Sequence, residues 1–285
     1  MGSRAVRPLQ AALVLVAFGP ILLEWAEYTG SVSRINYSLL VPVLAIALAG
    51  TVMRTLAEVP APTPTERQWG YLSMAMAGIL LFLGSLTAIF TVSIAGFPFA
   101  VLGLLGIVYG NQGLFRMRYA LLMLFAMVPV PLPLLDRLTP YMVKATGAIS
   151  VMMVKPFDSA ASWIGSDLTY NGWTLHVAEA CSGSGTLLVL GTLTLFMAGL
   201  FRLRLKAMII TMVLIPFITL FINGLRIAVL AWILDGFGVE AVTGVFHEVI
   251  GQGVVIAGAV ALALAVDRIS NRMARKAEKP SGGTS

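Results

Sequence analysis

The sequence predicts an all-α polytopic membrane protein with about eight transmembrane helices, a small extracytoplasmic helix and a β-hairpin. Composition is the first observation: 58% of the 285 residues are hydrophobic and only 11% are charged, whereas roughly a quarter are charged in soluble domains. The second is the length of the apolar runs, because about 20 apolar residues cross the hydrocarbon core as a helix. The third is an Asn-Gly pair between two alternating stretches, which is typical of a hairpin turn.

Most of the chain consists of apolar segments joined by short polar loops. The first segment follows Arg4 and Arg7, and no small-x-small cleavage site comes after it, only Glu24-Trp25-Ala26-Glu27, so we expect it to remain as a membrane helix. Residues 1–266 then form a single transmembrane domain, and residues 267–285 a basic cytoplasmic tail. The predicted spans are residues 9–23, 37–53, 70–89, 93–110, 119–135, 184–201, 207–234 and 249–266.

The placement of Lys and Arg predicts the orientation, because cytoplasmic loops carry an excess of both. With the N-terminus inside, 14 of the 19 basic residues fall on the cytoplasmic side, and both termini are predicted to be cytoplasmic in an inner membrane. The net charge of +6 does not indicate nucleic acid, because the basic residues lie in short loops rather than on one face. The five basic residues predicted to lie outside are Arg34, Arg137, Lys144, Lys155 and Arg226.

The longest stretch without a predicted span, residues 136–183, falls on the outside. Its first half, from Leu138, has mixed polarity and predicts an amphipathic helix on or in the outer leaflet. In its second half, Asn171-Gly172 separates two alternating runs and predicts a β-hairpin whose second strand leads toward Cys181.

Cys181 is the only cysteine, and His176 and His247 are the only histidines. These counts exclude an internal disulfide and a Cys-rich metal site and argue against a zinc site, so no cofactor is expected. Cys181 lies in Glu179-Ala-Cys-Ser-Gly183, directly before an apolar helix. A helix N-terminus lowers the pKa of a thiol and offers free N–H groups to an oxyanion. The alternative is an inert cysteine packed as a small hydrophobe.

Arg226 is unusual because it lies within an apolar segment, where an unpaired arginine is costly. Spacings of four and three place Thr219, Asn223 and Arg226 on one helix face. Pro216 and Gly224 allow a break or kink in this helix, which would open its backbone to a cavity. The alternative is a structural arginine that extends to the outer interface.

His247 is predicted to lie at the outer start of the last helix. The topology thus places Cys181, Arg226 and His247 at one outer level, although they come from three different helices. A thiolate, an imidazole and a guanidinium are the groups needed to cleave an amide through a thioacyl intermediate.

Three motifs, Glu179-Ala-Cys-Ser-Gly, Asn223-Gly-Leu-Arg-Ile and Phe246-His247, occur in this order. Together with Pro129-Val-Pro-Leu-Pro, Leu138-Thr-Pro and the hairpin, they resemble the exosortase/archaeosortase family of membrane-embedded, sortase-like cysteine transpeptidases. The resemblance covers roughly residues 125–266. It implies that Cys181 is the nucleophile, His247 the acid/base and Arg226 the stabiliser of the oxyanion or thiolate, with Glu179, Ser182 and Asn223 in support.

The resemblance also implies the substrate. It is an exported protein with a C-terminal sorting signal: a short motif, often Pro-Glu-Pro, then a membrane helix and a basic cluster. The acyl product would pass to a lipid or polysaccharide acceptor in the cell envelope. Many members carry a branched apolar residue and Arg or Gln after the Cys-Ser/Thr-Gly turn, whereas this chain has Ser184-Gly185-Thr186. This departure bears on the substrate subtype.

Three other functions are consistent with the sequence. In a transporter or channel, Arg226 would bind an anion beside a broken helix, but no inverted second copy of such a helix is present. A non-catalytic envelope scaffold would tolerate loss of the thiol. A hydrolytic intramembrane protease differs from a transpeptidase only in the nucleophile that resolves the thioacyl enzyme.

Overall fold

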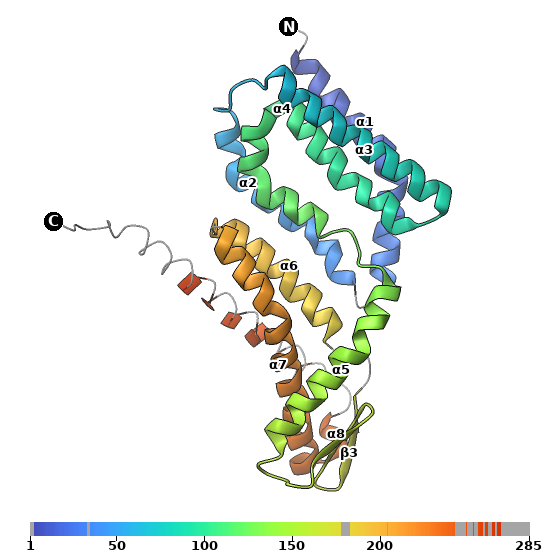
Figure 1. Cartoon of the computed structure of the whole chain (residues 1–285), viewed down its shortest axis with the longest axis vertical. Helices are drawn as coiled ribbons and strands as arrows, with labels where there is room; N and C mark the ends of the chain where they lie inside the picture. The colour runs from blue at the N-terminus through green and yellow to red at the C-terminus, as the bar shows by residue number, and fades with distance from the viewer. Residues whose placement is uncertain are drawn as a thin grey trace, which may run out of the picture. The chain divides into compact units, whose positions relative to one another are not determined.

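The computed structural model describes residues 3–32, 35–177, 183–203 and 205–242, together with scattered positions between 249 and 268. The chain divides into two compact units, residues 1–131 and 132–285. Both units are mostly helical (Figure 1). The predicted helical membrane fold is therefore confirmed in its class.

The first unit is built from membrane-length helices. In the part of the chain that the structure describes, five segments are long and apolar enough to cross a membrane: Ala12–Ser31, Asn36–Leu56, Pro64–Thr87, Phe90–Phe125 and Lys206–Phe237. The number eight is not confirmed and stays a prediction. The elements of the first unit are α1 (Ser3–Ser31), the 3₁₀ helix η1 (Asn36–Leu40), α2 (Val41–Leu56), α3 (Pro64–Thr87) and α4 (Phe90–Phe125).

Glycines let α3 and α4 approach each other closely. A Cβ atom on Gly70 would lie 2.8 Å from the backbone nitrogen of Ile107, and one on Gly103 would lie 2.8 Å from the carbonyl oxygen of Gly70. Gly96 meets the carbonyl of Ala77 at the same distance. Small residues at such a seam are typical of membrane helices, where close van der Waals packing replaces the hydrophobic effect as the driving force for association.

α4 is a helical hairpin rather than one long helix. Gly110 has φ 62° and ψ −166°, which is not helical. Along a straight helix, residues 99 and 125 would be about 39 Å apart, yet the rings of Phe99 and Phe125 meet edge to face with centroids 5.1 Å apart. The chain therefore turns back at Gly110, and two limbs, residues 90–109 and 111–125, run antiparallel (Figure 1).

This turn changes the prediction for residues 119–135. The second limb of α4 ends at Phe125, and α5 begins at Leu132, so a continuous helix over 119–135 is wrong. The side chain of Glu66 stabilises the turn: its Oε1 accepts a hydrogen bond from the backbone N–H of Asn111 at 3.0 Å. Its Oε2 accepts one from the backbone N–H of Thr63 at 2.8 Å, which completes the capping box of α3.

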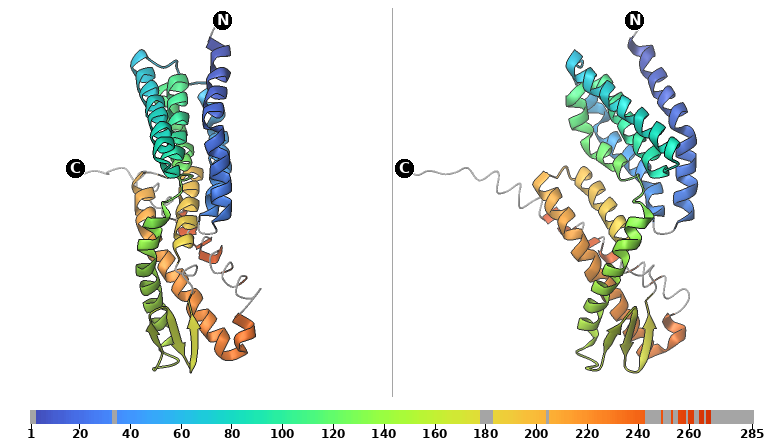
Figure 2. Two further views of the ribbon diagram at one scale, coloured as in Figure 1. Left: turned by 90° about the vertical axis from the view of Figure 1, so that its right-hand side faces the viewer. Right: turned by 45° about the vertical axis from the view of Figure 1, so that its right-hand side comes forward.

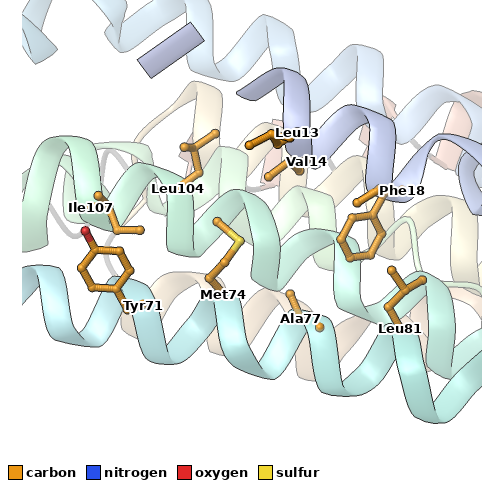
Figure 3. A pocket seen from close by; sticks show the side chains of 11 residues that line it. Leu13, Val14, Phe18, Tyr71, Met74, Ala77, Leu81, Leu104 and Ile107 are labelled. Carbon is orange, nitrogen blue, oxygen red and sulfur yellow. The ribbon is translucent and has the colours of Figure 1, made fainter. Parts of the chain in front are cut away.

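An apolar pocket of about 360 Å³ lies among α1, α3 and the first limb of α4 (Figure 3). Phe18, Met74 and Leu104 are among its lining residues, and apart from Tyr71 every lining side chain is apolar. Such a pocket suits hydrocarbon, and the Tyr71 hydroxyl is its one polar side-chain group.

In the described part of the second unit up to residue 242, three longer helices combine with a small sheet. The predicted hairpin is confirmed: Asn171 (φ 47°) and Gly172 (φ 81°) form the turn, and positive φ at both positions is what a type I′ turn requires. A first strand pairs with the hairpin and was not predicted. The elements are α5 (Leu132–Val154), β1 (Ser162–Ile164), β2 (Asp167–Tyr170), β3 (Trp173–His176), α6 (Ser184–Leu200), α7 (Leu205–Phe237) and α8 (Val239–Val242).

The antiparallel sheet packs against α5 and the last third of α7 (Figure 2). Leu168 and Tyr170 alternate with half-buried residues along β2, so both point into the same core. That core also contains Ile227, Ala228 and Ala231 of α7. The helix expected after Leu138 is confirmed as part of α5. α5 contacts both α7 and the sheet, so the two helices and the sheet pack together.

Candidate functional site

A buried polar stripe lies on α7. Thr219 and Asn223 are 0% and 1% exposed, and Arg226, one turn further, is half-buried. The Nδ2 atom of Asn223 donates a hydrogen bond to the carbonyl oxygen of Thr219 at 3.0 Å. The three side chains share one helix face, as predicted.

α7 is one helix from Leu205 to Phe237, so Pro216 and Gly224 do not break it. Gly224 serves close packing instead, because a Cβ atom there would lie 2.5 Å from Cγ2 of Ile149 on α5. α7 therefore lacks the broken helix expected for a transporter, and the transporter hypothesis loses its main structural support.

The start of α6 lies directly against this stripe. Gly183, the N-cap residue of α6, has φ +90°, in the left-handed region that favours glycine. A Cβ atom on Gly183 would lie 2.1 Å from Nδ2 of Asn223 and 3.5 Å from Cγ2 of Thr219. Both the backbone conformation and the available space therefore require glycine at this position.

Two polar atoms of the stripe are sealed from solvent. Oγ1 of Thr219 and Oδ1 of Asn223 are fully buried and have no hydrogen-bond partner among the described residues. Other buried threonines differ: the hydroxyl of Thr211 donates to the carbonyl of Ala207 at 2.8 Å, and that of Thr194 donates to Leu190 at 2.7 Å. An unsatisfied buried polar atom costs roughly 1–3 kcal/mol, so the stripe is not explained by packing alone.

The position of Arg226 along α7 relates it to a membrane boundary. About 20 residues separate Lys206 from Arg226, which corresponds to ~30 Å of helix and matches the thickness of a hydrocarbon core. If Lys206 marks one boundary, Arg226 lies at the other. Beyond Arg226, the buried residues Ile227, Ala228 and Ala231 of α7 pack in one core with residues of α5 and the sheet.

The family model for transmembrane exosortases matches residues 6–265. The chain belongs to the transmembrane exosortase family. No curated protein and no solved structure matches the chain. The resemblance seen in the motifs covers only about residues 125–266, whereas the family match begins near the N-terminus, so the first helices of this exosortase belong to the family domain as well.

Four of the six predicted site residues, Glu179, Cys181, Ser182 and His247, lie outside the residues that the structure describes. Arg226 and Asn223 are described, and both lie on the α7 stripe. Gly183 was missed as a site residue by the sequence reasoning, although its place in the Cys-Ser-Gly turn was a usable signal.

Gly258, a described residue near the end of this exosortase, also lies against α7 beside the stripe. A Cβ atom on Gly258 would lie 2.2 Å from Cδ1 of Ile222. Ile222 directly precedes Asn223. The segments that follow Cys181 and His247 in the sequence therefore both reach the same part of α7, through Gly183 and Gly258.

Asn171 in the turn of the hairpin makes one hydrogen bond to the end of α7 and one to the loop between α5 and β1. Asn171 donates from Nδ2 to Oδ2 of Asp235 at 2.9 Å, and its backbone N–H donates to Oδ2 of Asp158 at 2.8 Å. Burial raises the pKa of Tyr170 above its usual range, and the charges of Asp235 and Asp158 raise it further. This arrangement anchors β3, from which the chain continues toward Cys181.

His176 pairs with Asp167 across the hairpin. The Nδ1 atom of His176 and Oδ1 of Asp167 are 2.6 Å apart, and the two residues are register partners on β3 and β2. Both side chains are exposed, so the pair adds little to stability. It is a cross-strand pair of the hairpin, and the sequence analysis did not predict it.

Proposed function

We propose that this exosortase is a membrane-embedded cysteine transpeptidase or protease that processes the C-terminal sorting signal of exported proteins. Cys181 is the nucleophile, His247 the general acid/base and Arg226 the stabiliser of the oxyanion, with Glu179, Ser182 and Asn223 in support. Family membership supports the reaction class.

The contact between Gly183 and Asn223 is the observation that carries the proposal. Cys181 precedes Gly183 by two residues, so covalent geometry alone keeps their Cα atoms within about 7 Å. Asn223 and Arg226 are one helical turn apart on α7. The contact therefore supports a thiol that lies close to the guanidinium.

The proposed reaction has two steps. In the first, the thiolate of Cys181 adds to the carbonyl carbon of the scissile amide, and Arg226 stabilises the negative charge on the oxygen. The C–N bond then breaks as the imidazolium of His247 gives its proton to the leaving amine. In the second, an acceptor nucleophile or water attacks the thioester, His247 takes its proton, and the thiolate leaves.

The proposed setting is an inner membrane crossed by about eight helices, with both termini cytoplasmic and the site on the outer side. Arg202 and Lys206 lie at the α6–α7 connection, where an excess of basic residues marks the cytoplasmic side. Arg226, about one core thickness away, then falls at the outer boundary. The substrate would be anchored by its own membrane helix and the acceptor would be a lipid or polysaccharide of the envelope.

Co-expression with a reporter tests this function. The reporter is an exported protein that ends in a Pro-Glu-Pro motif, a membrane helix and a basic cluster, and mass spectrometry defines its new C-terminus. We expect cleavage by the wild-type exosortase and full-length reporter with the Cys181→Ala or His247→Ala variant at equal enzyme levels. A free carboxylate on the product would indicate hydrolysis, and an added mass would indicate transfer.

Processing by Cys181→Ala at the wild-type rate would overturn the proposal. A matched control is Thr211→Val, which removes a buried hydroxyl of α7 away from the stripe. This variant should cleave the reporter normally, because the hydroxyl of Thr211 serves only its own helix.

A further inference from the structure

We propose that Asn223 is a positioning residue: through its contact with Gly183, and with help from Thr219, it fixes the orientation of the turn that carries Cys181. The inference rests on the proposed function in assigning Cys181 as the nucleophile. The inference gives Asn223 a specific role: this residue does not touch the substrate but determines where the thiol of Cys181 points.

The contact is tight on both sides. Gly183 cannot accommodate a Cβ atom, because Nδ2 of Asn223 occupies that space at 2.1 Å. Asn223 is held in turn, because Nδ2 donates to the carbonyl of Thr219 at 3.0 Å and the side chain is 1% exposed. A rigid amide that presses on a glycine N-cap restricts the backbone immediately before α6.

The sealed oxygens indicate that the contact is more than packing. Oδ1 of Asn223 and Oγ1 of Thr219 are buried and have no partner among the described residues. A leucine and a valine would fill similar volumes without the cost of a buried unsatisfied acceptor. We infer that these two oxygens serve a polar role at the contact with Gly183 rather than filling space.

Such a role has a chemical consequence for the thiol. A thiolate is stabilised when it faces the N-terminus of a helix or a guanidinium, and the effect falls off within the first turn. If the turn before α6 loses its fixed orientation, Cys181 samples positions further from both groups. The thiol should then ionise at higher pH.

The single cysteine makes this measurable without any substrate. The probe is iodoacetamide, and the readout is the rate of alkylation of the purified full-length protein in detergent between pH 5 and 10. Since Cys181 is the only thiol, the pH profile reports its ionisation alone. Asn223→Leu keeps the approximate volume and removes the polar atoms, and Thr219→Val removes only the hydroxyl.

For Asn223→Leu we expect the alkylation profile to move to higher pH, with a rate about threefold below wild type at pH values below the thiol pKa, as for a rise of ~0.5 in that pKa. Thr219→Val should shift the profile in the same direction by less. The matched control is Thr211→Val, because Thr211 is a buried threonine of the same helix whose hydroxyl bonds to Ala207, and its profile should match wild type.

A wild-type profile for folded Asn223→Leu would overturn the inference, and so would an equal shift in Thr211→Val. If Asn223→Leu fails to fold, Thr219→Val decides: a shift supports the role, and an unchanged profile refutes it. The outcome is separate from that of the proposed function. If Asn223→Leu shifts the alkylation profile but the wild-type protein cleaves no reporter, the positioning role stands and the proposed peptidase function fails. If Asn223→Leu leaves the profile unchanged and the wild-type protein cleaves the reporter, the positioning role fails and the peptidase function stands.

Discussion

Replacing Gly110 with alanine tests the helical hairpin of α4 directly. Gly110 has φ 62° and ψ −166°, a combination that is essentially restricted to glycine. A Cβ atom there would also lie 3.0 Å from Cβ of Pro62 and 3.2 Å from Cδ of Glu66. The substitution therefore strains the backbone and presses on the start of α3.

The expected magnitude follows from these two terms. A non-glycine residue in this backbone region costs about 1–3 kcal/mol. The two neighbours can shift by a few tenths of an ångström, because one is a loop proline and the other the end of a flexible side chain, so the steric term is smaller. We expect Gly110→Ala to lower the free energy of unfolding by about 2 kcal/mol.

Gly78→Ala is the matched control. Gly78 lies in the interior of α3 with helical backbone, and a Cβ atom there would have nothing within 4 Å. Alanine in a helix interior is favoured over glycine by roughly 0.5–1 kcal/mol, so this variant should be slightly more stable than wild type. The two variants add the same methyl group, but their changes in the free energy of unfolding should have opposite signs.

Denaturant titration of the purified proteins in detergent, followed by circular dichroism, measures both variants. In each detergent tested, the midpoint of Gly110→Ala should lie below that of wild type. The reasoning is refuted if Gly110→Ala is as stable as Gly78→Ala, because alanine would then fit at residue 110 and α4 would have no reason to turn there.

Three further predictions concern the second unit. A membrane-impermeant thiol reagent should label Cys181 in intact cells or right-side-out vesicles only from the outer side, and labelling solely from the cytoplasm would contradict the proposed orientation. Arg226→Lys keeps the charge but loses the planar fork of donors, so reporter cleavage should fall at least about tenfold at normal expression; unchanged cleavage would reduce Arg226 to an interfacial anchor. Because the folded pKa of Tyr170 is raised above 10.0 by burial and by Asp235 and Asp158, the unfolded chain releases this proton first, so stability is full below pH 10 and falls as the pH rises toward the folded value. Tyr170→Phe should weaken this alkaline loss in a thermal-unfolding series, and an identical loss would show that other groups cause it.

Local chemistry in the sequence determined a large part of the fold. The apolar runs predicted helices of membrane length, and Asn171-Gly172 predicted the hairpin because few residue pairs accept positive φ at both turn positions. The order of the Cys, Arg and His motifs indicated the exosortase family, which the family match confirms. The spacing of Thr219, Asn223 and Arg226 predicted their common face because a helix repeats every 3.6 residues.

Other features depend on which segments meet, and the sequence pattern does not specify that. Gly110 and Gly224 are both glycines within apolar helical sequence, yet the chain turns back at Gly110, whereas α7 continues as a helix through Gly224. The difference lies in the surroundings. Glu66 receives the N–H of Asn111 beyond the turn, whereas α5 packs against Gly224 and leaves its helical hydrogen bonds intact.

The candidate site also has features that the sequence predicts and features that depend on tertiary contacts. The sequence by itself indicated which residues are candidates for amide cleavage, because a thiol, an imidazole and a guanidinium are recognisable by type. Only the tertiary structure decided that Gly183 rests on Asn223, since that contact joins two helices whose relative position is set by close packing. Periodicity describes one helix at a time, and a contact between helices depends on the shapes of both surfaces.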